Sequence, residues 1–140
     1  MGRINIGRVL LGGLVAGIVL NIGEYILNDK VLGAQMKEYL ATHRFPTPGG
    51  NAIAVAVVMT FVLGIVIVLG YAAIRPRFGA GPKTAIIAAL FAWFGVYVYP
   101  DVVGAAFGFV PTSILPIALV WGLVEYNVAA LIGAWLYKEA

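Results

Sequence analysis

The sequence predicts an all-α integral membrane protein whose four transmembrane helices form one bundle. Hydrophobic residues make up 62% of the 140-residue chain, and charged residues make up only 11%. Soluble domains carry about 25% charged residues, so this chain has too few charges to cover a surface that faces water. Four apolar stretches approach or exceed the roughly 20 residues that cross a bilayer. We therefore expect a single membrane domain over residues 1–140.

The four spans are delimited by prolines and glycines. The Arg-Pro-Arg triplet at 75–77 predicts the end of the second span, because proline cannot continue a helix. Pro82 lies near the start of the third span, where a missing N–H costs little. Thr112 or Ser113 is the expected N-cap of the fourth span. The spans are expected over residues 4–27, 52–74, 84–99 and 115–137.

Two of the connecting loops have informative patterns. In the first loop, apolar residues fall at helical spacing opposite Lys30, Lys37 and Glu38. This pattern predicts an amphipathic helix over residues 30–43 that lies on the outer membrane surface. The third loop, residues 101–110, is short and apolar. It either dips into the membrane interface or extends the third helix past a kink at Pro100.

The lysine and arginine residues are divided unevenly between the two sides of the predicted bundle. Six lie in the tails and the second loop, and three lie in the first loop. Cytoplasmic loops are enriched in lysine and arginine, so both termini are expected in the cytoplasm. The basic residues lie at helix ends, which favours membrane lipid as a partner and argues against nucleic acid. No cleavage motif follows the first apolar run, so we interpret it as a retained span.

One face of the first span is small and then polar. Gly13, Gly17, Asn21 and Tyr25 recur every four residues, and Glu24 lies beside them. Residues four apart share a helix face. A carboxyl and an amide on an otherwise apolar transmembrane helix are costly, so they indicate either a binding role or contacts between helices.

The fourth span mirrors the first, because small residues four apart accompany Glu125 and Asn127. Small residues let transmembrane helices approach closely. The first and fourth spans are therefore predicted to pack against each other. The predicted packing residues are Gly13, Gly17, Gly122, Ala129 and Gly133.

The polar residues lie at different depths in the predicted spans. At about 1.5 Å per residue, Glu125 lies near the middle of its span, whereas Asn21 and Glu24 lie nearer the outer end, at the level of Tyr97. Apart from Arg8 near the start of the first span, no lysine or arginine lies inside a predicted span. We therefore expect desolvation to keep Glu125 protonated, with Asn21 as its hydrogen-bond partner. The candidate ligand- or ion-binding residues are Glu125, Glu24, Asn21, Asn127 and Tyr97.

These candidate residues have two interpretations. They line a funnel that opens outward and closes near Glu125, or they only hold the helices together by hydrogen bonds. Tyr97 also fits a plain interfacial aromatic residue.

The sequence contains no recognisable catalytic or cofactor site. There is no cysteine, and His43 is the only histidine. A thiolate metal site, a His-rich metal site and bis-histidine haem are thereby excluded within one chain. No glycine-rich phosphate loop and no serine nucleophile set is present. We expect neither a cofactor nor a bound metal, and we expect that the protein is not an enzyme.

A weak internal repeat is present. The pattern Gly-x-Tyr-x₃-Asp begins at Gly23 and again at Gly95. Two hairpins in the same orientation would form a parallel repeat of residues 1–76 and 77–140, related by an axis along the membrane normal.

Two resemblances bear on the class of protein. Four spans with an acid in the first are superficially similar to the small multidrug transporters, but Glu24 lies late in its span and its neighbours do not match that family. The phrases LVAGIVLNIGEYILN, YAAIRPRFGAGPKTA and ALVWGLVE resemble a group of uncharacterised small bacterial four-span membrane proteins. This second resemblance implies a multi-pass protein of the bacterial inner membrane and brings no activity.

The sequence is compatible with two functional classes. The favoured one is a non-enzymatic accessory or structural subunit that packs in a larger membrane assembly or self-associates. Its support is the short loops, the lack of a soluble domain and the uncharged second span. The alternative is a small proton- or cation-linked carrier that uses the intramembrane acidic and amide cluster.

Overall fold

The computed structural model describes residues 2–140, which are predominantly helical and contain no strand. Four helical segments are long and apolar enough to cross a membrane, as predicted for a multi-pass membrane protein. These segments are Ile6–Val31, Gly50–Phe78, Pro82–Ala106 and Thr112–Leu136.

Three of the four spans change helix type along their length. The first consists of α1 (Ile6–Tyr25) and a π-helix (Ile26–Val31), and it is followed by the short α2 (Gly33–Thr42). The second is α3 (Gly50–Phe78), which is regular throughout. The third consists of α4 (Pro82–Trp93), a π-helix (Phe94–Val98) and α5 (Tyr99–Ala106). The fourth consists of a 3₁₀ turn (Thr112–Ile114) and α6 (Leu115–Leu136).

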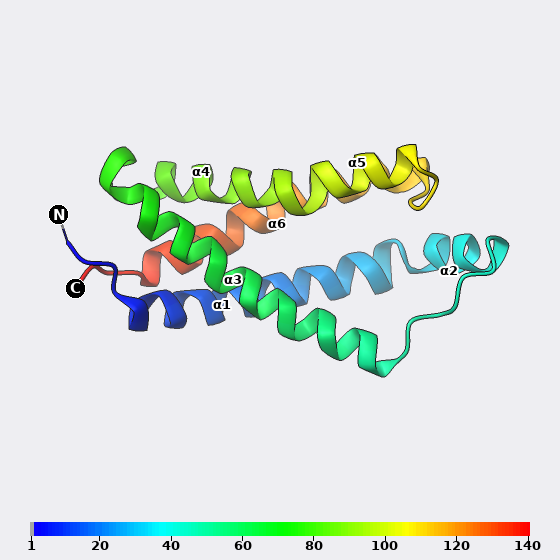
Figure 1. Ribbon diagram of the computed structural model, residues 1–140, viewed down its shortest axis with the longest axis horizontal. Helices are drawn as coiled ribbons and strands as arrows, with labels where there is room; N and C mark the ends of the chain where they lie inside the picture. Colours follow the sequence, from blue (N-terminus) through cyan, green and yellow to red (C-terminus); the bar gives the residue numbers. More distant parts are fainter. Residues whose placement is uncertain (1) are drawn as a thin grey trace.

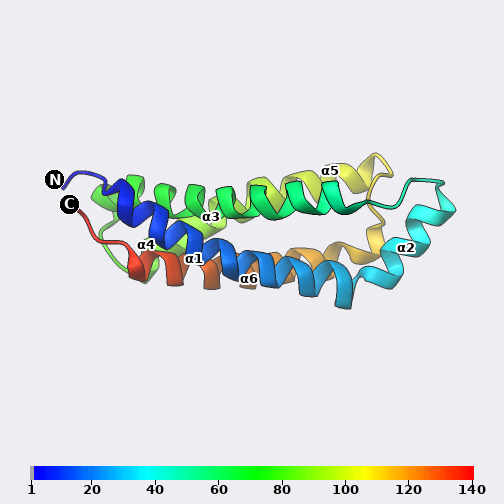
Figure 2. The same cartoon turned by 90° about the horizontal axis from the view of Figure 1, so that it is seen from below.

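The spans form an elongated four-helix bundle. Both termini lie at one end with the turn between α3 and α4, and α2 lies at the opposite end near the end of α5 (Figure 1). In Figure 2, α3 and α5 lie along one side of the bundle and α6 along the other, and α1 crosses from the α3 side near the termini to the α6 side near α2. Contacts run around the bundle from α1 to α3, α4 and α6 and back to α1. We call the end with the termini the inner end and the end with α2 the outer end.

The second span ends later than the sequence predicts. It continues through Pro76 to Phe78 instead of ending at residue 74. Pro76 lies in the last turn, so it removes only the hydrogen bond to Ala72. The helix stops at Gly79, whose positive φ of 85° a side-chain-bearing residue would rarely adopt and whose N–H donates to Arg75 O. The last turn therefore tolerates a proline that a helix interior would not.

The third span also extends beyond its predicted end. The structure adopts the second alternative for residues 101–110, because the helix continues past Pro100 to Ala106. In a regular α-helix, a proline ring clashes with the carbonyl four residues earlier. The π-helix immediately before Pro100 changes the hydrogen-bond register and accommodates the ring. The extension places Asp101 on a helix.

Glycines determine which helices approach most closely. A Cβ added at Gly13 or Gly17 would collide with the backbone of α3 at Ile65 or Phe61. The prediction that these two glycines pack against the fourth span is therefore wrong, because they form the interface with α3. Gly133 of α6 instead meets Gly12 and Ala16 of α1.

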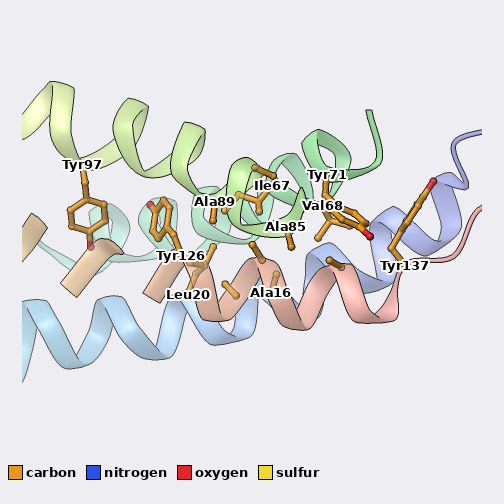
Figure 3. Packing of buried hydrophobic residues seen from close by; sticks show 14 of the residues in the cluster. Ala16, Leu20, Ile67, Val68, Tyr71, Ala85, Ala89, Tyr97, Tyr126 and Tyr137 are labelled. Carbon is orange, nitrogen blue, oxygen red and sulfur yellow. The ribbon is translucent and has the colours of Figure 1, made fainter. Parts of the chain in front are cut away.

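The remaining predicted packing residues lie inside the bundle. Ala129 is fully buried, and Gly122 lies under the ring of Tyr97. Figure 3 shows small side chains such as Ala85 and Ala89 packed with Leu20, Ile67 and Val68 between the helices.

The inner end of the bundle is closed by two tyrosines. The rings of Tyr71 and Tyr137 meet edge to face with their centroids 5.9 Å apart. The Tyr71 hydroxyl accepts from Gly81 N at 3.1 Å, and the Tyr137 hydroxyl accepts from Asn5 N at 3.3 Å. Arg75 Nη1 lies 3.2 Å from Glu139 Oε1 beside them. These contacts tie the N-terminus, the α3–α4 turn and the C-terminus together.

The helix predicted over residues 30–43 is present as α2, with a π-helix before it. Leu32 at its start is 2% exposed, and Met36 packs against the core. The hydroxyl of Tyr39 donates to the carbonyl of Gly108, which fixes α2 to the loop after α5. This helix therefore covers part of the outer end of the bundle.

Candidate functional site

The outer end of the bundle contains a cavity of about 360 Å³, which we call the outer cavity. All four spans contribute to its wall. Its polar lining consists of Glu24, Asn28, Thr60, Tyr97, Asp101 and Tyr126. Its apolar lining consists of Leu27, Leu32, Met36, Leu63, Val96, Val110, Ile114 and Ala118.

Glu24 is held in place from two sides. The Tyr97 hydroxyl donates to Glu24 Oε1 at 2.5 Å, and Asn28 Nδ2 donates to Glu24 Oε2 at 2.9 Å. Asn28 also donates to the Glu24 carbonyl at 2.9 Å. The two residues are four apart in the chain, so the same helix face presents both. The carboxyl is therefore oriented by a tyrosine from the third span and an amide from its own span.

Tyr97 depends on its neighbours in α6 for its position. A Cβ on Gly122 would lie only 2.7 Å from Tyr97 Cγ, so the glycine leaves the space that the ring occupies. The Tyr126 ring meets it edge to face, with centroids 5.3 Å apart. In Figure 3, Tyr97 extends from the third span toward α1. Its side chain is 6% exposed, so it is a buried structural link and not a plain interfacial aromatic residue.

Asp101 is the residue that the sequence prediction missed. It was assigned to a loop, whereas the structure places it on α5, half-buried and lining the outer cavity. It follows Tyr97 by four residues, the spacing at which helical residues share a face. This four-residue spacing is the feature of the sequence that could have placed Asp101 beside Tyr97. The cavity thus has two carboxyl groups, and none of the lysines or arginines within residues 2–140 lines it.

Glu125 lies next to this site but does not line the outer cavity. Its side chain is 7% exposed, and neither carboxyl oxygen has a hydrogen-bond partner. The polar groups close enough to act on it are those of Glu24, Trp121 and Tyr97. Gly23 makes room for it, because a Cβ there would lie 2.7 Å from Glu125 Cδ. The structure therefore places a third acid, without a hydrogen-bond partner, behind the Glu24–Tyr97 pair.

The two predicted asparagines lie outside the cavity. Asn21 Nδ2 donates to Gly17 O at 2.9 Å and to Val57 O of α3 at 3.4 Å. Asn127 Nδ2 donates to Leu123 O at 2.7 Å. The expected hydrogen bond between Glu125 and Asn21 is absent, because the Asn21 amide faces α3. Of the five predicted polar residues, the structure brings Glu24, Tyr97 and Glu125 together.

Comparisons with protein-family models, with curated proteins and with solved structures found no match for this chain. The side chains described over residues 2–140 include no cluster of three or more histidine, cysteine, aspartate or glutamate residues that could hold a metal ion. The site is therefore interpreted from its own geometry.

Proposed function

We propose that the protein is a small non-enzymatic membrane carrier that takes up a proton or another small cation from the outer side. The observation that supports this best is the outer cavity, where the carboxyls of Glu24 and Asp101 share one space with no basic residue. Paired acids in a cleft with apolar walls raise the local cation concentration. Carboxylate, hydroxyl and amide oxygens are also the ligands that hard cations prefer.

The contacts suggest a path for the cation. It is first attracted into the outer cavity by Glu24 and Asp101. Tyr97 bonds to Glu24 and lies beside Glu125, so it connects the cavity to the buried acid. Beyond Glu125, the tyrosine contacts at the inner end close the bundle. This arrangement corresponds to a carrier that is open outward and closed inward, and transport would require the Tyr71–Tyr137 contact to open.

Flux measurements with cavity variants test this proposal. In proteoliposomes, the wild-type protein should carry protons or sodium, measured with a pH-sensitive dye and with radioactive sodium. Glu24→Gln and Asp101→Asn should each lower the flux about tenfold or more, because one carboxylate about 4 Å from a cation contributes about 1–4 kcal/mol of attraction. Asp29→Asn is the matched control, because Asp29 is exposed, pairs with Lys30 at 3.0 Å and lies outside the cavity.

Equal flux in Asp101→Asn and in Asp29→Asn would contradict the proposal. So would the absence of proton and sodium flux in the wild-type protein. A stoichiometric partner retained after gentle extraction from native membranes, together with no flux, would instead support an accessory subunit.

The accessory subunit is the second candidate function, and the outer half of α3 favours it. Residues 50–59 are all exposed, and a hydrogen bond from Asn21 of α1 reaches this part of the helix at Val57 O. A partner subunit or a second copy of the chain would cover this segment, and membrane lipid would cover the rest of the apolar surface.

We further propose that both termini lie in the cytoplasm, that α2 lies at the outer membrane surface, and that the membrane is the bacterial inner membrane. The inner end carries six of the nine lysines and arginines, which supports this orientation.

Cysteine accessibility tests the orientation. Thr47 and Gly79 are both exposed, and they lie at opposite ends of the bundle because Thr47 precedes α3 and Gly79 follows it. In intact cells, a cysteine at Thr47 should react with a membrane-impermeant thiol reagent, and a cysteine at Gly79 should react only after the cells are opened. The reverse labelling pattern would overturn the orientation.

A further inference from the structure

A second cavity of about 460 Å³ opens on the opposite side of Glu125, between α1 and α6. We call it the lateral groove. Its walls are valine and isoleucine side chains of the two helices, together with Gly23. Val120 and Val124 at its edge are 62% and 59% exposed on the apolar outer surface of the bundle. The groove therefore faces the hydrocarbon of the membrane and not the water at the outer end.

Only two polar side chains line this groove, Glu125 and Trp121. Glu125 is 7% exposed and has no partner for either oxygen, and Trp121 Nε1 is also buried and unpartnered. An unpaired buried polar group costs about 1–3 kcal/mol. No lipid-chain atom can satisfy these groups, because a hydrocarbon neither donates nor accepts. Their arrangement in an otherwise apolar groove points to a ligand with a polar end and an apolar body.

The unpartnered atoms define the polar end of that ligand. Trp121 Nε1–H can only donate, so the ligand must accept a hydrogen bond. A Glu125 carboxylate can only accept, whereas a protonated Glu125 has one O–H that donates and a carbonyl oxygen that accepts. A hydroxyl group pairs with Glu125 in either state and also accepts from Trp121. An ammonium group has no lone pair for Trp121, and a ketone has no proton for a Glu125 carboxylate.

We propose that the lateral groove binds a membrane-soluble alcohol, whose hydroxyl donates to Glu125 and accepts from Trp121 Nε1–H. The apolar body of the alcohol lies along the valine and isoleucine walls and enters from the membrane. Glu125 also lies on the cation path proposed above, but the groove shares no lining residue with the outer cavity, so alcohol binding is measured separately from cation flux.

Protection of Glu125 from a lipid-soluble carbodiimide tests the site. Dicyclohexylcarbodiimide modifies protonated carboxyls that it reaches through the membrane, and peptide mass spectrometry reports the modified fraction. With the purified protein in lipid nanodiscs at pH 5, Glu125 should be modified. An excess of n-decanol should slow this modification about tenfold, which corresponds to about 1.4 kcal/mol. Equal membrane concentrations of n-decane or decylammonium should leave the rate within about twofold of the untreated sample.

Two variants test whether the carbodiimide reaches Glu125 through the lateral groove. Val124→Trp fills the groove and should slow the modification of Glu125 even without decanol. Val58→Trp on α3 is the matched control, because Val58 is 60% exposed and lies outside the groove, and it should change nothing. Modification of Glu24 and Asp101 by a water-soluble carbodiimide should be unaffected by decanol.

Several outcomes would overturn the proposal. Equal protection by decane and decanol would show that the groove is only a slot for an acyl chain. Equal protection by decylammonium would show that charge and not a hydroxyl is recognised. No modification of Glu125 at pH 5 would show that the groove is closed to the membrane. Each of these readouts uses the wild-type protein, so the test does not depend on the folding of a variant.

Discussion

Gly64→Ala should destabilise the bundle more than a methyl group added at any exposed position of α3. An added Cβ would lie 2.6 Å from Gly17 N and 2.9 Å from Gly17 Cα, and it would come closer still to the carbonyl of Gly13. These are backbone atoms of α1, so no side-chain rotation can relieve the contact. The two helices must move apart, and overpacking of this kind costs about 1–3 kcal/mol.

The measurement is thermal unfolding in detergent, followed by circular dichroism. Gly64→Ala should lower Tm by about 5 °C or more. Gly70→Ala is the matched control in the same helix, because nothing lies within 4 Å of a Cβ added there. It should be neutral or slightly stabilising, since alanine is the better helix former by about 1 kcal/mol. Equal Tm values for the two variants would mean that α1 and α3 do not touch at these glycines.

The contact of Gly64 with α1 could not be predicted from the sequence. The second span is apolar on all sides, so no periodicity distinguishes a face that meets lipid from one that meets another helix. Nothing in the sequence therefore indicates that Gly64 meets α1, and the predicted partner of Gly13 and Gly17 is the fourth span instead of α3. Composition predicted four spans correctly, because the requirement for length and apolarity is the same for every transmembrane helix. Pairing between helices depends on shape, which composition does not encode.

The sequence identifies some residues of the candidate site and not others. Glu24 and Glu125 stand out because a carboxyl in an apolar helix is costly wherever it points. Tyr97 is a candidate from its depth alone, and its link to Glu24 is not predictable, because a tyrosine near a span end fits the membrane interface equally well. Asp101 is not among the predicted site residues, because its place on a helix depends on which of the two alternatives for residues 101–110 holds, and the π-helix before Pro100 has no sequence signature. The lateral groove arises from two helices together and has no signal in either one.

Glu24 and Glu125 should respond in opposite directions when each is replaced by leucine. Glu24→Leu should destabilise the protein by about 1–3 kcal/mol, because the carboxyl accepts from Tyr97 and Asn28 and its removal leaves a buried tyrosine hydroxyl unpartnered. Glu125→Leu removes a buried carboxyl that has no partner, in favour of an apolar side chain of similar volume. Because an unpartnered buried polar group costs about 1–3 kcal/mol, its removal should leave the stability unchanged or raise it.

The changes in unfolding free energy of the two leucine variants should have opposite signs. This difference separates an acid that serves function from one that holds helices together. Chemical unfolding in detergent should show Glu125→Leu at least as stable as the wild type, while cation flux and carbodiimide labelling at this position are lost. Glu125→Gln keeps the shape without a titratable group, so it should fold normally and lose the same flux. A loss of more than about 1 kcal/mol in Glu125→Leu, comparable to that in Glu24→Leu, would show that the Glu125 carboxyl makes stabilising hydrogen bonds. A stable Glu125→Leu variant without flux would mean that the wild-type protein keeps this acid at a cost in stability, as expected where a buried group serves function.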